Sequence, residues 1–118
     1  MTIVVSASGK TLDAQVDPRF GRAAFFVAVD SESGAFQAHE NTQNLNAAQG
    51  AGIQSAETVS RLGAAVVITG NCGPKAFRTL SAAGIKTVVG AEGTVGAAVE
   101  AFKSGLLAPT DAPNVEGH

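Results

Sequence analysis

The chain has 118 residues, a formal net charge of -2, and a composition that is 45% hydrophobic and 15% charged. This length and balance are typical of a single globular domain with its own core, and they exclude a disordered chain. The weakly acidic charge gives no reason to expect nucleic acid as a partner, and no apolar run approaches the ~20 residues that cross a membrane.

The N-terminus indicates the cellular location, and the cysteine content excludes two kinds of structural site. Residues 1–5 begin an apolar run with no basic region before it, so we predict no signal peptide and expect a cytoplasmic protein. The single cysteine, Cys72, excludes an internal disulfide and a zinc site built from cysteines alone.

The first half of the chain predicts three strands. Residues 2–7 form a short apolar run that Ser8 and Gly9 end, and residues 24–29 form a similar run. The turn-rich residues 30–34 and the following residues 35–40 indicate a hairpin. Residues 41–52 are polar and rich in Gly, Asn and Gln, which predicts a loop.

The second half alternates helices and strands. The elements that we expect there are a helix over 53–62, a strand over 64–69, a helix over 74–83, a strand over 85–89 and a helix over 95–104. Pro74 suits the first position of its helix, and Thr94 is a suitable cap for the last one. We expect one domain over residues 1–107 and a flexible tail over residues 108–118.

The predicted order is therefore β-β-β-α-β-α-β-α, which defines an α/β fold. Strands that alternate with helices indicate a parallel sheet with right-handed crossovers. The first three strands are expected to join this sheet as an antiparallel meander.

The segment Thr69–Phe77 joins a strand to a helix and is the first candidate binding site. In open α/β sheets, ligands bind at the carboxyl ends of the strands, and a helix N-terminus offers free N–H groups and positive charge. Gly73 allows close approach of a ligand, and Lys75 and Arg78 add cations. These residues, together with Asn71, predict an anion site, although a tight turn with solvated side chains explains the same pattern.

Cys72 lies in this segment and has three interpretations. A thiol at a helix N-terminus is expected to ionise more easily. A cysteine nucleophile needs a histidine base, and no spacing ties His39 or His118 to Cys72. The alternatives are a soft contact to a metal centre and inert packing. Of the three interpretations, the sequence favours inert packing most.

Three further segments contain glycines next to possible ligand contacts. In residues 17–22, Arg19 and Arg22 flank Gly21 and are either solvated or directed at a large anion. Gly50 and Gly52 match a dinucleotide-binding motif poorly, but they can donate N–H groups to the same pocket. Residues 6–11 end in Gly-Lys-Thr without the first glycine of a P-loop; this segment lines the same crevice if the first and fourth strands are neighbours.

The chain resembles the dinitrogenase iron–molybdenum cofactor biosynthesis family, which includes NifX-like carriers and the C-terminal part of NifB. The resemblance covers the chain from the first strand to about residue 107. The matching segments are Asp-Pro-Arg-Phe-Gly-Arg at 17–22, Gly-Ala-Gly-Ile at 50–53, Val-Val-Ile-Thr-Gly-Asn at 66–71, Gly-Pro-Lys-Ala-Phe at 73–77 and Ala-Gly-Ile-Lys at 83–86. The resemblance implies a ribonuclease-H-like three-layer fold with a five-stranded mixed sheet.

The resemblance also implies a function without catalysis. It implies a carrier for an anionic molybdenum-containing metal–sulfide cluster, either a molybdenum–copper sulfide cluster or a related molybdenum–iron–sulfur precursor, with cluster donor and acceptor proteins as partners. The cofactor-binding residues expected are Arg19, Arg22, Gly50, Gly52, Asn71, Cys72, Gly73, Lys75 and Arg78. Cys72 would be a soft metal contact, although family members often have an apolar residue at its position.

The chemistry of such a cluster fits this set. Sulfides already fill the coordination of the metals, so the protein needs to supply cations, N–H donors and an apolar surface. Two other classes of function remain open from the residues. One is a regulatory or protein-interaction module that docks through the sheet edge or the acidic hairpin of residues 30–40, and the other is an enzyme with Cys72 as nucleophile.

Overall fold

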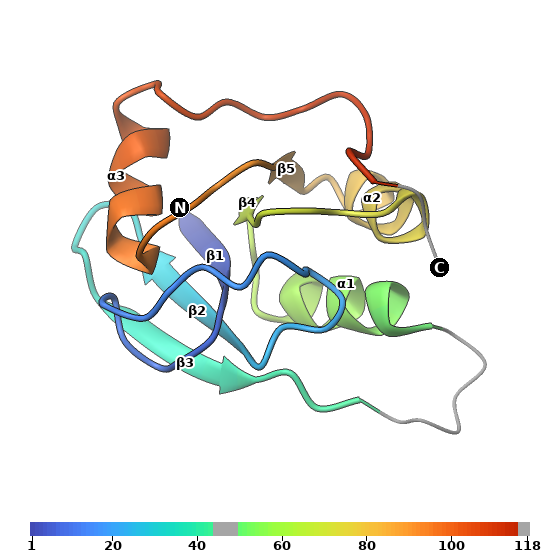
Figure 1. Ribbon diagram of the computed structural model, residues 1–118, viewed down its shortest axis with the longest axis horizontal. Helices are drawn as coiled ribbons and strands as arrows, with labels where there is room; N and C mark the ends of the chain where they lie inside the picture. Colours follow the sequence, from blue (N-terminus) through green and yellow to red (C-terminus); the bar gives the residue numbers. More distant parts are fainter. Residues whose placement is uncertain (44–49, 116–118) are drawn as a thin grey trace.

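The computed structural model describes residues 1–43 and 50–115 (Figure 1). The strands are β1 Thr2–Ala7, β2 Phe25–Asp30, β3 Phe36–Glu40, β4 Val66–Ile68 and β5 Lys86–Val88. The helices are α1 Ala51–Arg61, α2 Pro74–Ala82 and α3 Val95–Lys103. The predicted order of elements is confirmed.

The boundaries differ from the prediction at the first helix. Helix α1 already begins at Ala51, so Gly52 is helical and does not belong to the loop predicted over residues 41–52. Residues 44–49 of that predicted loop lie outside the described residues. Thr94 caps α3 as expected, because its side chain accepts a hydrogen bond from the N–H of Ala97.

The strands form one five-stranded sheet in the order β3-β2-β1-β4-β5. Strand β1 pairs antiparallel with β2 and parallel with β4. Strand β2 pairs antiparallel with β3, and β4 pairs parallel with β5. This is the ribonuclease-H-like arrangement, with the expected meander on one side and the parallel strands on the other.

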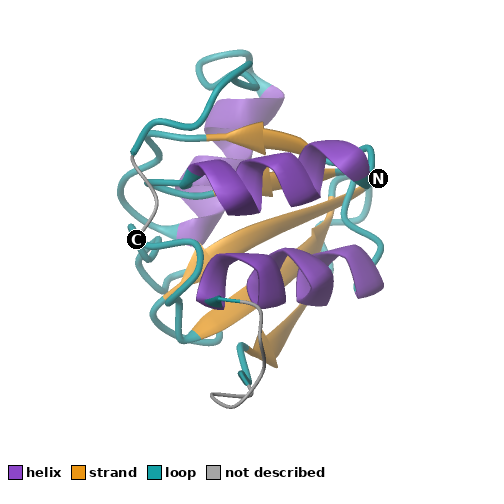
Figure 2. Ribbon diagram, turned by 90° about the vertical axis from the view of Figure 1, so that its right-hand side faces the viewer, coloured by secondary structure: helices purple, strands orange, loops and turns teal. Residues whose placement is uncertain are grey.

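Three layers result from this sheet. Helices α1 and α2 cover one face and α3 covers the other, as Figures 1 and 2 show. Each face of the sheet has its own hydrophobic core. Alternate residues of β1 pack into these two cores, because successive side chains of a strand point to opposite faces. Ile3 and Val5 belong to the cluster that contains Val95 of α3, whereas Val4 belongs to the cluster that contains Val59 of α1.

A buried hydroxyl pair fixes the ends of the two central strands. The hydroxyl of Ser6 donates to the carbonyl oxygen of Asp17 at 2.8 Å and lies 2.7 Å from the hydroxyl of Thr69. Because Ser6 has only one hydroxyl proton, Thr69 is the donor in the second bond. The N–H of Asp17 donates to the carbonyl oxygen of Ser6 at 2.8 Å. The chain after β1 is therefore tied directly to the end of β4.

The β2–β3 hairpin closes at Asp30–Ala35. Gly34 has a φ of 78°, the left-handed conformation that glycine adopts readily. The N–H groups of Glu32 and Ser33 donate to the side chain of Asp30, and these bonds lower the pKa of its carboxyl group. Within the described residues, no helix has the length and apolar content needed to cross a membrane.

Candidate functional site

Three chain segments meet at the carboxyl ends of β1 and β4. They are residues 17–22 after β1, the N-terminus of α1, and residues 70–75, which lead from β4 into α2. Arg19 and Asn71 form an isolated parallel bridge, and the N–H of Phe20 donates to the carbonyl oxygen of Asn71 at 3.2 Å. These contacts bring together residues that lie 51 and 52 positions apart in the sequence.

Glycines allow these segments to approach closely. A Cβ atom placed on Gly70 would lie 2.7 Å from the Cα of Pro18, and one on Gly21 would lie 3.0 Å from the Cα of Gly52. A Cβ on Gly52 would lie 3.1 Å from the Cβ of Ala76 in α2. The backbone of residues 17–22 therefore packs against both other segments, and the first turns of α1 and α2 touch each other.

Both helix N-termini at this site lack a side-chain cap. The N-cap residues are Gly50 for α1 and Gly73 for α2, and neither has a side chain that could accept from first-turn N–H groups. Neither first turn contains an acidic residue. The two positive helix ends therefore stand side by side without a carboxylate of their own helix to neutralise them.

The four cations of the predicted set are exposed. Arg22 follows Gly21 directly, and Lys75 lies in the first turn of α2, so both lie at the meeting point of the segments. Arg19 is also there, but its Nε lies 3.6 Å from the carboxylate of Asp17. Arg78 lies nearly one turn further along α2.

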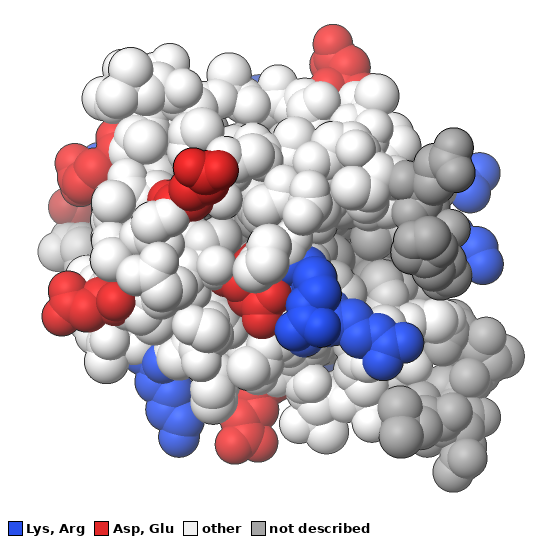
Figure 3. Space-filling view, in the orientation of Figure 1, with Lys and Arg blue, Asp and Glu red and all other residues white. Residues whose placement is uncertain are grey.

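The surface charge follows this arrangement. Most of the Lys and Arg atoms on the face shown in Figure 3 lie at its centre and right-hand edge, the side on which Figure 1 places α1 and α2. The basic side chains on this face therefore lie on the side of the two open helix ends.

The environment of Cys72 corrects one expectation. Its side chain is 1% exposed and packs in the core cluster with Val67 and Ala76. Burial raises the pKa of the Cys72 thiol from 9.0 to about 11, so the prediction that the helix N-terminus eases its ionisation is wrong. Desolvation of the thiolate outweighs the attraction of the helix end because the sulfur points into the apolar core.

Among the described residues, no histidine lies next to Cys72 to act as its base. His39 lies in β3, opposite Phe26 of β2, and β2 and β1 lie between that strand and β4. His118 lies outside the described residues. The same part of the chain contains no group of three or more His, Cys, Asp or Glu side chains that could hold a metal ion.

The site also contains residues that the sequence did not indicate. The side chain of Asn114 accepts from the N–H of Cys72 at 2.8 Å and donates to the carbonyl oxygen of Gly70 and the side-chain oxygen of Asn71. The N–H of Asn114 donates to the carbonyl oxygen of Cys72 at 3.2 Å. Local pattern cannot reveal this contact, because it joins positions 42 apart.

A second polar group supports the turn at Gly21. Its carbonyl oxygen accepts from the side chains of Gln43 and Ser55, and the side chain of Asn41 donates to the carbonyl oxygen of Ala23 at 2.9 Å. These polar residues hold the segment that contains Arg22 against α1. In the sequence, Asn41 and Gln43 indicated only a loop, and Ser55 was part of the helix predicted over residues 53–62.

Residues 6–11 line this site only at their first residue. Ser6 contacts Thr69, but the chain then turns toward the other face of the sheet, where the carbonyl oxygen of Leu12 accepts from the N–H of Gly96. The ammonium of Lys10 lies 5.4 Å from the ring centre of Phe25. The expectation that the whole segment shares the crevice is therefore wrong.

The tail predicted over residues 108–118 makes contacts in its described part. The N–H of Thr110 donates to the carbonyl oxygen of Thr87 in β5 at 2.8 Å, and Asn114 bonds the loop before α2. The tail thus runs from the edge of the sheet to the candidate site.

Fold and site together define a class: a small ribonuclease-H-like α/β protein with a basic, glycine-lined site at two helix N-termini. Over residues 1–105 the chain matches the family described as dinitrogenase iron-molybdenum cofactor. It belongs to this family of cofactor-related binding proteins.

Two solved structures are similar over nearly the whole chain. One is the apo form of the orange protein from Desulfovibrio gigas, with 44% sequence identity, a TM-score of 0.91, and coverage of 97% of this chain and 96% of that chain. The other is a putative NifB protein from Thermotoga, with 34% identity, a TM-score of 0.81 and 98% coverage of both chains. An uncharacterized protein of Methanocaldococcus jannaschii is 28% identical over 95 residues, 79% of this chain and 80% of that protein.

The close backbone approach at Gly70 predicts that Gly70→Ala destabilises the fold by about 1–3 kcal/mol, because the new methyl group would overlap Pro18. Gly96→Ala is the matched control, since its Cβ would meet Leu12 at ordinary contact distances of 3.4 and 3.5 Å and alanine favours a helix. Urea denaturation measures both. Equal stability of the two variants would contradict the packing described at Gly70.

The buried thiol predicts a loss of stability at alkaline pH. As pH rises above 9.0, the thiol ionises in the unfolded chain, whereas in the folded protein it stays protonated to about pH 11. The free energy of unfolding therefore falls by about 2–3 kcal/mol across this window from this group. Urea denaturation at pH 8 and pH 11 should show this extra loss in the wild type relative to Cys72→Ala, and identical pH dependence would refute it.

The bonds of Asn114 predict that Asn114→Ala speeds hydrogen exchange of the Cys72 amide by about tenfold or more, because that N–H loses its acceptor. Exchange monitored by NMR measures this, with the exposed tail residue Val115→Ala as the control. An unchanged rate at Cys72 would show that the tail does not hold this loop in solution.

Proposed function

We propose that this protein is a non-enzymatic carrier of an anionic molybdenum-containing metal–sulfide cluster. The observation that carries the proposal is the convergence of two uncapped helix N-termini with the basic segments around Arg22 and Lys75. The cluster is the cargo of the protein, in accordance with the family to which the chain belongs.

The electrostatics favour a large anion over a small one. The contact between Gly52 and Ala76 sets the first turns of α1 and α2 next to each other, so N–H groups of both helices face one region. Arg22 adds a planar, weakly hydrated cation, which suits a diffuse sulfide surface better than an ammonium does. The favourable terms are distributed over several donors, as a bulky polyanion requires.

Apolar and small residues complete the surface. Ala51 and Ile53 are half-buried in the first turn of α1, and Gly50 precedes them. Soft sulfides are polarizable, and they lose little when water is replaced by such a surface. The buried thiol of Cys72 makes a smaller contribution in this proposal, because its sulfur packs in the core and not on this surface.

The proposal also covers the type of cluster, the exchange partners and the role of each residue. The cargo is a molybdenum–copper sulfide cluster or a related molybdenum–iron–sulfur precursor, and the protein exchanges it with donor and acceptor proteins in the cytoplasm. Gly50, Gly52, Asn71 and Gly73 contribute backbone donors in this arrangement, and Arg19, Arg22, Lys75 and Arg78 contribute charge.

A second candidate, a protein-interaction module, has one observation in its favour. Strand β3 is an edge strand, and Phe36 at its start is 44% exposed. An unpaired strand edge with an exposed aromatic residue is a surface that a partner strand can join. A docking role of this kind is also compatible with cluster delivery.

Reconstitution of the apo protein with tetrathiomolybdate and Cu(I) tests the carrier function. We expect a coloured complex that remains with the protein on gel filtration, and the proposal fails if no such complex forms. Arg22→Ala and Lys75→Ala should each weaken binding about 3- to 10-fold, because each removes a cation at the helix ends.

Two further variants test where on the protein the cluster binds. Arg61→Ala removes an exposed cation at the other end of α1 and should leave the affinity unchanged. Cys72→Ala should have a smaller effect than the two cation variants. A larger loss from Cys72→Ala would instead make the thiol a direct ligand.

A further inference from the structure

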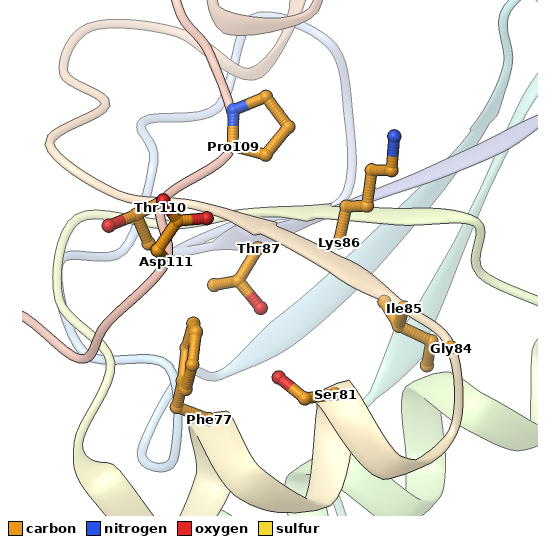
Figure 4. A pocket seen from close by; sticks show the side chains of 9 residues that line it. All are labelled: Phe77, Ser81, Gly84, Ile85, Lys86, Thr87, Pro109, Thr110 and Asp111. Atoms are coloured by element: carbon orange, nitrogen blue, oxygen red, sulfur yellow. The ribbon is translucent and has the colours of Figure 1, made fainter.

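A separate cavity of about 440 Å³ lies along α2 and β5, toward the C-terminal end of α2. One wall comes from α2, the floor from β5, and the third side from the tail (Figure 4). The lining residues are Phe77, Ser81, Gly84, Ile85, Lys86, Thr87, Pro109, Thr110 and Asp111.

The floor of this cavity contains a buried hydroxyl without a partner. Thr87 is 2% exposed, and its Oγ1 has no hydrogen-bond partner among the described residues. Buried polar groups in proteins are nearly always paired, so an unpaired one needs an explanation. In Figure 4 the hydroxyl groups of Thr87 and Ser81 both point into the space beside the ring of Phe77. A ligand in this space would supply the missing partner.

The electrostatics of the cavity favour a cation. Helix α2 has no basic residue in its last turn, whereas α1 has Arg61 and α3 has Lys103. The negative end of the α2 dipole therefore remains uncompensated beside the cavity. The carboxylate of Asp111 stands on the tail side, and the ammonium of Lys86 points away from the cavity (Figure 4).

The aromatic wall adds a geometric preference. The ring of Phe77 stands on edge at the side of the space toward which the two hydroxyls point. A planar cation can stack on such a ring, and a guanidinium combines that stacking with several N–H donors in one plane. A hydroxyl pair, a carboxylate and a ring match this group better than they match an anion.

We propose that this cavity is a binding site for a guanidinium group. The guanidinium donates to the hydroxyls of Thr87 and Ser81, pairs with Asp111, and stacks on Phe77. This site is distinct from the anion site at the N-terminus of α2, and it does not depend on the cluster-carrier function.

NMR titration of the apo protein tests the proposal with matched ligands. N-acetyl-arginine amide represents an arginine side chain of a partner protein, and agmatine represents a free guanidinium compound. N-acetyl-citrulline amide replaces the guanidinium by a neutral urea of the same shape. We expect saturable shifts at the amides of Ser81, Thr87 and Asp111 with the guanidinium ligands and at least about fivefold weaker binding of the urea.

The result with each ligand tests a different part of the proposal. Binding of the arginine amide alone would identify a protein side chain as the source, and binding of agmatine alone would identify a free compound. Equal binding of the urea would overturn the role of charge. The absence of shifts at these amides with ~50 mM of either guanidinium ligand would overturn the site.

Variants test the named residues. Thr87→Val keeps the shape of the side chain but removes the unpaired hydroxyl, so the melting temperature of the free protein should rise while the affinity falls about tenfold. Asp111→Asn should weaken binding of the guanidinium but not of the urea, and Asp13→Asn, on an exposed loop that does not line the cavity, should have no effect. Unchanged affinity in both Thr87→Val and Asp111→Asn would overturn the proposal.

Discussion

The position of β1 in the centre of the sheet is the constraint on which the rest of the structure depends. This strand pairs antiparallel with β2 and parallel with β4, and residues Ile3–Ala7 are fully buried. Because β1 and β4 run in the same direction, their carboxyl ends meet at one edge of the sheet. The loops that follow them are then forced together, and the hydroxyls of Ser6 and Thr69 bond across the junction.

The candidate anion site is mainly a property of the backbone. Glycines at positions 21, 52 and 70 bring three segments within contact distance, and the glycine N-caps leave the N–H groups of two helices open. Side chains then add charge at the rim of this arrangement, where they are exposed. Such a site can hold a bulky anion through many weak donors, without a ring of coordinating side chains.

The two ends of helix α2 differ in chemical character. Its N-terminus is positive, lacks a cap and lies next to the N-terminus of α1. Its C-terminal half lines a cavity with a buried hydroxyl, a carboxylate and an aromatic ring. The tail passes both places, since Thr110 bonds the edge strand and Asn114 bonds the loop at Cys72. Helix α2 and the C-terminal tail therefore make contacts at both proposed sites.

The sequence by itself determined the order of elements, the mixed sheet and the family, because these follow from local periodicity, turn residues and short motifs. It also indicated that the segments around Arg22, Gly52 and Lys75 belong to one site. Only the tertiary structure decided the state of Cys72 and the role of Asn114. Burial of the thiol depends on how α2 packs on β4, and the Asn114 contact joins residues distant in the chain, so no local pattern contains either.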